Sequence, residues 1–278
     1  MPKRSLLLAA FFCRLVSLQA STPTADGQSD AAIARETSDP TSNLWYFYTE
    51  LTLGIEPRLP LSKSNQLTVE FQPSLPVQLS DSWRLLNFPD LVLASNGTPS
   101  GGQVAGIESL SWLWALSPCQ KPFGLSWGMG PCMSFPVATE SRLAASQWQT
   151  GIGGVLCYRS DHFVSSVLLK SVWTTSGPGN AAGSFQAQYN LQYFFGNGMQ
   201  VGLGRPRIEY NWNREGRGTW DVPVGVDFAR VCHFGKLPVK IVLQYEFFAI
   251  NDSRWQPEHL FQITFIPVLR SPQRGPIW

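Results

Sequence analysis

The chain has 278 residues, of which 14% are charged and 13% aromatic, and its formal net charge at pH 7 is +2. A balance so close to neutral does not favour nucleic acid, which usually binds a strongly basic surface. No apolar run approaches the roughly 18 to 20 residues that a membrane-spanning helix needs. These properties exclude a nucleic-acid-binding protein and a helical membrane protein.

The N-terminus resembles an export signal. Lys3 and Arg4 precede an apolar run at 6–12, and a small-residue cleavage site follows, which predicts a signal peptide over residues 1–20. Cys13 raises the alternative of a lipoprotein, although two phenylalanines before it are bulkier than such a signal requires. Removal of residues 1–20 leaves 18 basic and 19 acidic residues, a net charge of −1.

Three further regions follow the signal. Residues 21–43 are rich in Ser, Thr, Ala, Asp and Gly without periodicity, which predicts a disordered periplasmic leader. Residues 44–270 show no internal shift of composition and are expected to form one domain, a β-barrel. Residues 271–278 are a C-terminal tail.

The clearest pattern in the predicted domain is strand-like alternation. At 123–135, Leu, Trp, Met and Phe occupy one parity, and Gly, Ser and Cys the other. Because successive side chains of a strand point to opposite faces, alternation this long separates two environments. Its length suits a transmembrane β-strand of about 9 to 11 residues. Twelve segments of this kind are predicted, at 44–53, 66–79, 83–93, 107–116, 123–135, 148–158, 163–174, 184–195, 200–213, 219–234, 239–249 and 258–269.

The connections between these segments alternate between long and short. Outer-membrane barrels show this order because periplasmic turns are tight and external loops are extended. An even number of antiparallel strands also lets the sheet close without an edge. The sequence therefore predicts an all-β fold, a closed antiparallel up-and-down transmembrane β-barrel of outer-membrane type with about 12 strands.

Energetics decides which parity faces lipid. A Lys or Arg on the lipid side near the midplane costs about 2 to 4 kcal/mol, so the charged parity must face the lumen. Pro206 changes the parity of its segment, which predicts a bulge there. We expect a narrow polar passage whose lumen-lining candidates are Glu70, Gln72, Gln186, Gln188, Asn190, Asp227, Lys240 and Glu246.

Seven short runs carry a family resemblance across nearly all of residues 44–268. They are FQPSLP at 71–76, WRLLN at 83–87, WGMGP at 127–131, FPVAT at 135–139, WQTG at 148–151, WDVPVG at 220–225 and GKLPV at 235–239. With these runs the chain resembles the bacterial outer-membrane barrels known as meta-pathway phenol-degradation proteins, which are also described as transporters. The resemblance implies an outer-membrane location and passage of small solutes, aromatic ones included. It brings no catalytic residues.

Candidate chemistry elsewhere is sparse. The run GLSWG at 124–128 matches the G-x-S-x-G hydrolase motif, but the pattern continues as strand, without the helix that this motif requires. A barrel lipid hydrolase would need a His beside an outward Ser, whereas Ser126 is expected to point inward. No metal site, cofactor or catalytic residue is predicted.

Four cysteines remain after the signal and allow three pairings. We expect Cys119, Cys132, Cys157 and Cys232 to be mostly free and packed, with Cys119 and Cys157 as the one pair to test.

Three functions stay open. The first is a passive outer-membrane channel or uptake protein for small solutes, and the second is a structural or surface-binding barrel plugged by residues 21–43. The third is a soluble periplasmic protein that binds a ligand. The expected partners of the first are outer-membrane lipid, a small solute and, during biogenesis, the barrel assembly machinery.

Overall fold

A computed structural model describes residues 29–55, 66–97, 102–144, 146–178, 181–213, 218–251, 257–269 and 276–277. The predicted signal peptide at 1–20 and most of the predicted tail at 271–278 lie outside the described residues.

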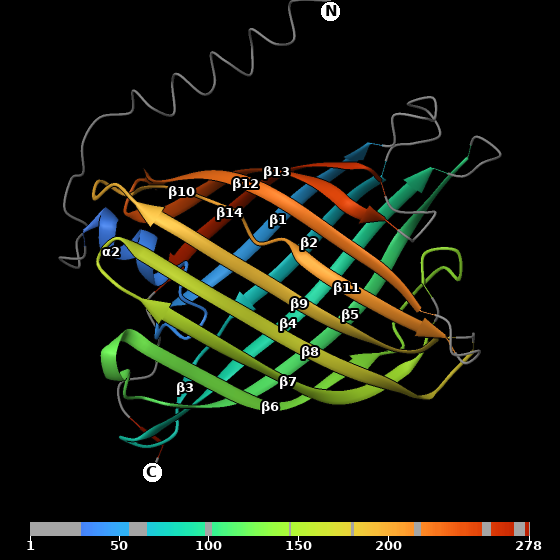
Figure 1. Cartoon of the computed structure of the whole chain (residues 1–278), viewed down its shortest axis with the longest axis horizontal. Helices are drawn as coiled ribbons and strands as arrows, with labels where there is room; N and C mark the ends of the chain where they lie inside the picture. The colour runs from blue at the N-terminus through green and yellow to red at the C-terminus, as the bar shows by residue number, and fades with distance from the viewer. Residues whose placement is uncertain are drawn as a thin grey trace, which may run out of the picture.

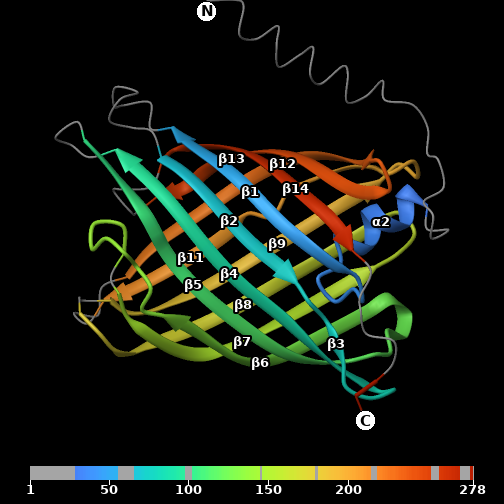
Figure 2. The same cartoon turned by 180° about the vertical axis from the view of Figure 1, so that it is seen from behind.

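The strands form one antiparallel sheet that closes on itself, seen from two sides in Figures 1 and 2. Their bounds are β1 (Trp45–Ile55), β2 (Gln66–Ser74), β3 (Val77–Gln78), β4 (Trp83–Gly97), β5 (Gln103–Pro118), β6 (Leu125–Phe135), β7 (Trp148–Arg159), β8 (Phe163–Ser176), β9 (Ala181–Phe194), β10 (Met199–Gly202), β11 (Arg207–Asn213), β12 (Gly218–Phe234), β13 (Leu237–Asn251) and β14 (His259–Leu269). A 3-10 turn, η1 (Pro122–Gly124), precedes β6. Apart from β2 with β3 and β10 with β11, strands that follow each other in the chain pair with each other, and β1 closes the ring by pairing with β14.

The ring has twelve positions, as the sequence predicts. β3 follows β2 alongside β4, and β10 and β11 together fill one position between β9 and β12. Because the ring is closed, no strand edge is left with unpaired backbone groups, which is the condition for crossing hydrocarbon with strands. In the described part of the chain, no helix is both long enough and apolar enough to span a bilayer.

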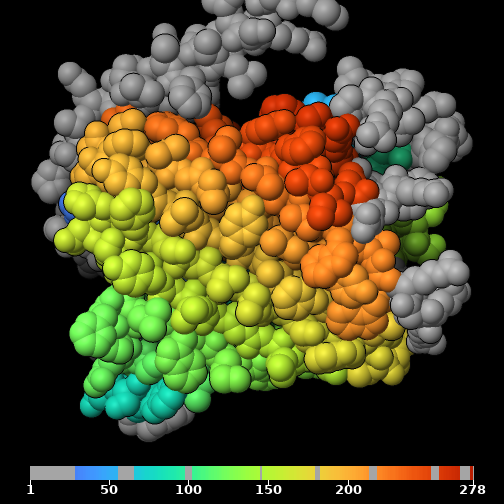
Figure 3. Space-filling view, in the orientation of Figure 1, coloured from blue at the N-terminus to red at the C-terminus, as the bar shows by residue number. Residues whose placement is uncertain are grey.

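The outer face of the barrel is apolar. Met129, Ile152 and Val226 are among the most exposed large side chains, at 61%, 62% and 58%. Alternate residues on the same strands are buried, and Figure 3 shows the wall as a continuous surface on the face in view. An apolar surface of this extent is typical of contact with lipid rather than water. The predicted partition of the two faces is confirmed, and the reading as a soluble ligand-binding protein is contradicted.

Two irregularities explain why parts of the sequence pattern are unclear. The β4–β5 register shifts between Val92 and Leu93, where the pairing passes from Ser109 to Ile107 and skips Glu108, so the side-chain parity of β5 changes there. Near Pro206 the strand is interrupted between β10 and β11. Gly202 pairs with Gln192 of β9, and Arg207 pairs with Gln188 of β9. The segment from 202 to 207 therefore carries one residue more than the facing segment of β9, and the side-chain parity changes as predicted.

The connections differ less between the two ends than the sequence predicts. They run from 2 to 6 residues at the end where β1 begins, and from 4 to 12 residues at the opposite end. The contrast is reduced because several strands, β4, β5 and β9 among them, continue into segments predicted as loops. We call the end where β1 begins the α2 end, after the helix that lies there, at the left of Figure 1.

The prediction of a disordered leader at 21–43 is wrong for residues 29–43. They form the helix α2 (Asp30–Glu36) and an ordered turn that leads into β1, and most of their side chains are buried. The composition suggested disorder because the segment is short and polar, but its polar groups find partners inside the barrel. Residues 21–28 lie outside the described part of the chain.

The exposed apolar side chains of the outer face, which we call the apolar belt, lead to a prediction that depends on depth in the membrane. Val226 is central in β12, while Phe234 ends that strand, and both are exposed on the outer face. Val226→Arg should lower the free energy of unfolding by about 2 to 4 kcal/mol, and Phe234→Arg by about 0 to 1 kcal/mol. Denaturant unfolding of the two variants in lipid vesicles measures the difference. Equal effects would contradict the placement of the belt.

Candidate functional site

The α2 end of the lumen is occupied by residues 29–43, which we call the plug. Ile33 and Ala34 are fully buried and belong to an apolar cluster with inward side chains of seven strands. The cluster members from the barrel wall are Tyr46, Tyr48, Cys157, Val164, Phe194, Ala229, Val231, Val242, Ile266 and Val268. The plug therefore packs against most of the circumference of the lumen.

Local sequence signals set the helix of the plug. The Ser29 hydroxyl accepts a hydrogen bond from the Ala32 amide at 3.2 Å, which caps the N-terminus of α2. Asp30 in the first turn and Arg35 in the last turn suit the helix dipole. The Thr37 hydroxyl donates to the Ile33 carbonyl at 2.8 Å and closes the C-terminus. The helix has only 7 residues, so packing in the lumen must supply much of its stability.

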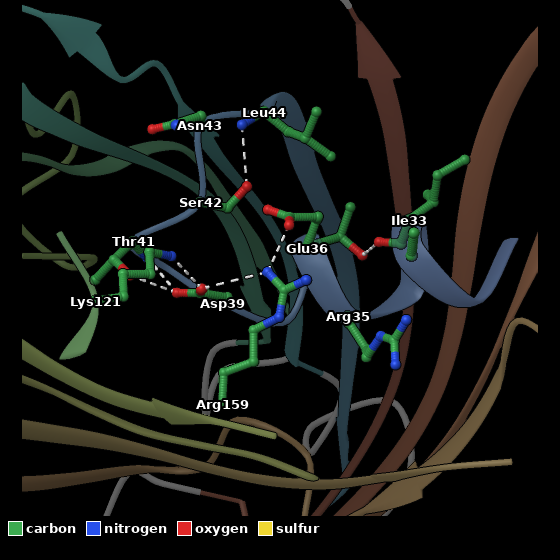
Figure 4. A network of polar contacts seen from close by, with 12 residues as sticks. Ile33, Arg35, Glu36, Asp39, Thr41, Ser42, Asn43, Leu44, Lys121 and Arg159 are labelled. Carbon is green, nitrogen blue, oxygen red and sulfur yellow. Dashed lines mark hydrogen bonds and ion pairs between the residues drawn. The ribbon is translucent and has the colours of Figure 1, made fainter. Parts of the chain in front are cut away.

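A polar latch fixes the plug to the barrel rim, as Figure 4 shows. The Asp39 carboxylate, with no exposed side-chain surface, lies 2.6 Å from the Lys121 ammonium and 3.7 Å from the Arg159 guanidinium. Arg159 also pairs with Glu36, and the Thr41 amide and hydroxyl donate to Asp39 at 2.8 and 2.6 Å. The plug thus brings its carboxylates to cations of the β5–β6 turn and β7.

The latch holds Asp39 ionised. Burial acts to raise its pKa, but the Lys121 charge and the hydrogen bonds from Lys121 and Thr41 outweigh burial, so the pKa lies below the ordinary value of 3.8. The charged form of Asp39 therefore favours the docked plug.

The other side of the plug is bonded to β9, β10 and β13. The Lys240 ammonium donates to the Ser38 hydroxyl at 2.7 Å, and the Asn190 amide donates to the Ser38 carbonyl at 3.1 Å. The Ser38 hydroxyl in turn lies 3.2 Å from Gln200 Oε1. Contacts on opposite sides of the ring show that the plug spans the lumen rather than lining one wall.

A small cavity of about 40 Å³ adjoins the inner face of the plug. Thr37, Ser38 and Pro40 of the plug form one side, and Tyr46 and Tyr48 contribute to the rest. Arg205 also lines it, with its guanidinium 4.4 Å from the centre of the Tyr48 ring, a cation–π contact. This volume holds water or a very small solute only.

Beyond the cavity, ion pairs cross the lumen. Lys170 of β8 lies 3.4 Å from Asp90 of β4, and Arg207 of β11 lies 2.8 Å from Glu70 of β2. Each pair joins strands that are far apart around the ring, so both pairs bridge the interior. The Arg205 guanidinium crosses in the same way, and donates to Gln72 at 2.9 Å and to Gln188 at 3.1 Å. The described lumen is therefore constricted at its middle as well as at the α2 end.

The interior is not polar all round, contrary to the polar passage that we expect from the sequence. Inward residues of β4 to β8 form a second apolar cluster, which contains Leu86, Phe88, Leu113, Ala115, Cys132, Val155, Leu168 and Val172. Glycines make room for it, since a Cβ at Gly153 would lie 2.9 Å from a methyl carbon of Leu113. One wall of the lumen is apolar and the other is polar.

All eight sequence-predicted lumen residues lie on inward positions of the wall. Gln72, Asn190, Asp227, Lys240 and Glu246 are buried, and Glu70, Gln186 and Gln188 are half-buried. They fall into two groups, because Asn190, Asp227 and Lys240 lie near the plug while the other five lie near or beyond the constriction. Gln186 donates to Glu209 at 3.2 Å, and Gln244 donates to Glu246.

Several charged residues of the lumen were not predicted from the sequence. Glu50, Asp90, Lys170, Arg205 and Arg207 take part in the constriction or border it. A signal existed for Lys170, a lone charge in an apolar strand, because the argument that places Lys240 inside applies to it equally. Arg205 lies in the break between β10 and β11, where parity gives no direction.

The position of Ser126 does not support a hydrolase. Its side chain is buried, lies 2.6 Å from the Thr41 hydroxyl of the plug and donates to the Cys157 carbonyl at 3.4 Å. The four cysteines of the predicted mature chain are free, so the pairing of Cys119 with Cys157 is not formed. Within the described ranges, no group of three His, Cys, Asp or Glu residues could hold a metal ion.

Comparison with solved structures shows that the fold is shared with an outer-membrane channel. No protein-family model matches the sequence, and no curated protein matches it. An outer membrane channel from Pseudomonas putida F1 is similar over 81% of this chain and 94% of that chain, with a TM-score of 0.62 at 11% identity. The KdgM porin in complex with disordered oligogalacturonate has a TM-score of 0.43 at 9% identity, over 80% and 97% of the two chains. Outer membrane phospholipase A from Escherichia coli has a TM-score of 0.44 at 8% identity, over 87% and 99%. The first similarity shows the fold, and the two weaker ones carry no argument.

The latch predicts that Asp39→Asn loosens the plug. Loss of a buried charged hydrogen-bonding partner should weaken docking by about 2 kcal/mol, or roughly thirty-fold. Hydrogen exchange at pH 7 should show protection of amides 33–42 reduced by that factor. Asp161→Asn is the control, because the Asp161 side chain is 95% exposed and lies 3.9 Å from Arg35. Equal protection in Asp39→Asn and the unaltered protein would show that the latch contributes nothing.

The lowered pKa of Asp39 predicts a pH dependence. Because the docked pKa lies below 3.8, the contribution of the ionised carboxylate is fully present above that pH and is lost as the pH falls through the docked pKa. Protection factors of the plug amides, corrected for intrinsic exchange, should be constant between about pH 5 and 8 and fall only below about pH 3.8. Asp39→Asn should remove the fall, and a loss of protection near neutral pH would contradict this assignment.

Proposed function

We propose that the protein is an outer-membrane channel for passive uptake of small solutes, closed at its α2 end by the plug. The observation that carries the proposal is a closed ring of twelve strands with an apolar outer belt and charged side chains inside. A lumen lined by charged groups is costly to build unless water reaches it, because buried charges lose hydration. The α2 end, where the connections are shortest, is assigned to the periplasm.

The wall chemistry supports amphipathic solutes, aromatic ones included. Leu86, Phe88 and Leu168 on one wall offer an apolar surface, and the opposite wall offers carboxylates and amides. The sequence resemblance to the meta-pathway phenol-degradation barrels supports the same class. Outer-membrane lipid around the belt and the barrel assembly machinery during biogenesis are the expected partners of such a barrel.

A structural or surface-binding barrel without transport is the second candidate. It is favoured by the plug together with the cross-lumen pairs Lys170–Asp90 and Arg207–Glu70, which leave a cavity of only about 40 Å³ beside the plug. Under this candidate the plug is a fixed part of the barrel and is never displaced.

Conductance separates the two candidates. A variant in which residues 29–43 are replaced by a Gly/Ser linker of equal length removes the plug while keeping the chain length. In planar bilayers the full chain should show low or intermittent conductance, and the linker variant should conduct at least about ten-fold more, because the plug blocks the lumen. The Asp161→Asn variant should behave like the full chain.

Two outcomes would count against the channel. Absence of conductance from both the full chain and the linker variant would favour the structural barrel, provided that heat-modifiable gel migration verifies folding. Equal conductance of both would show that the plug does not close the lumen.

A further inference from the structure

The lumen between the cavity and the far end carries an excess of acidic side chains. Six carboxylates face it from six strands, namely those of Glu50, Glu70, Asp90, Glu209, Asp221 and Glu246. Glu108, close enough to Glu209 for their charges to repel, adds a seventh. The described cations of this region are Lys170, Arg205 and Arg207.

The cations are already engaged. Lys170 pairs with Asp90, and Arg207 lies between Glu70 and Asp90 at 2.8 and 3.7 Å. Arg205 contacts the Tyr48 ring and the neutral amides of Gln72 and Gln188. The ion pairs that Lys170 and Arg207 make within 4.0 Å go to Glu70 and Asp90.

The carboxylate of Glu50 is held by neutral donors. The Thr52 hydroxyl and the Gln262 amide donate to one of its oxygens at 3.0 Å each, and the Thr264 hydroxyl and the Tyr48 phenol donate to the other. Four donors satisfy the hydrogen-bonding capacity of a carboxylate but do not cancel its charge. The Gln244 amide plays the same part for Glu246, and the Gln186 amide for Glu209.

At two places in the sheet, two acidic residues stand directly opposite each other on adjacent strands. Glu50 is the cross-strand partner of Glu70, and Glu209 is the partner of Asp221. Like charges directly opposite on adjacent strands destabilise a sheet. A lumen with a purely structural role has no need of such pairs, whereas a ring of carboxylates is the usual basis of cation selection.

We infer that this acidic region makes the channel selective for cations over anions, so that its solutes are cationic or neutral and anionic solutes are excluded. The inference rests on the proposed channel function. Fixed carboxylates concentrate cations in a narrow, low-dielectric lumen and repel anions from it. Near the plug, Lys121 and Arg159 oppose this effect only weakly, because they are paired with Asp39 and Glu36.

The test is the zero-current potential of the full chain in planar bilayers under a KCl gradient. Potassium should permeate at least about five-fold better than chloride. The double variant Glu50→Gln with Glu246→Gln should reduce this ratio at least about two-fold, because it removes two charges that the described cations Lys170, Arg205 and Arg207 do not pair with. Asp161→Asn, an exposed carboxylate at a turn of the α2 end, should leave the ratio unchanged.

Each outcome decides the inference. A ratio near one, or a preference for chloride, overturns it while leaving the channel intact. A potassium preference that is unchanged in the double variant overturns the role of these carboxylates. If the double variant fails to fold, Glu209→Gln repeats the test, because the neighbouring Gln186 can form a hydrogen bond with the new amide. Absence of conductance from both the correctly folded full chain and the linker variant overturns the proposed function, and the inference falls with it.

Discussion

The structure depends on the pairing of β1 with β14. Hydrocarbon offers no hydrogen bonds to the backbone, so a sheet that crosses it must leave no edge. This one pairing removes the two edges that the other pairings would leave at β1 and β14. Once the ring is closed, the period of two in every strand assigns each side chain to lipid or to the lumen. The apolar belt, the charged interior and the position of the plug all follow from that assignment.

Inside the ring, charge is arranged in two regions with different balances. Near the α2 end, Lys121 and Arg159 meet the acidic plug, and both partners gain from being together. Further in, the carboxylates outnumber the cations, and several are stabilised only by hydroxyls and amides. Such donors lower the free energy of a buried charge without neutralising it, which leaves the interior with a net field. A field of this kind has a function only if ions or solutes enter the lumen.

The sequence predicted the fold well because strand parity is a local property. Segments such as 184–195 carry their facing in the alternation itself, so Gln186, Gln188 and Asn190 could be placed inside without any knowledge of their partners. The plug escaped prediction because its order depends on distant contacts, such as Ser38 with Lys240 and Asp39 with Lys121. The cross-lumen pairs escaped for the same reason, since parity shows that Arg207 and Glu70 face inward but not that they meet. The apolar wall on β4 to β8 was missed because its inward side chains, such as Leu86 and Phe88, are apolar like the outward ones, so parity alone does not show that this part of the lumen is apolar.

The most direct test of the central claim is spin labelling along β13, one position at a time from 240 to 247, in a cysteine-free background reconstituted in lipid. The account predicts that labels at 241, 243, 245 and 247 are reached by oxygen dissolved in the bilayer, while labels at 240, 242, 244 and 246 are shielded from it. This follows because Tyr245 and Phe247 are exposed on the outer face and Lys240, Val242, Gln244 and Glu246 are buried inside. Accessibility without a period of two, or with the opposite phase, would contradict the assignment of the two faces.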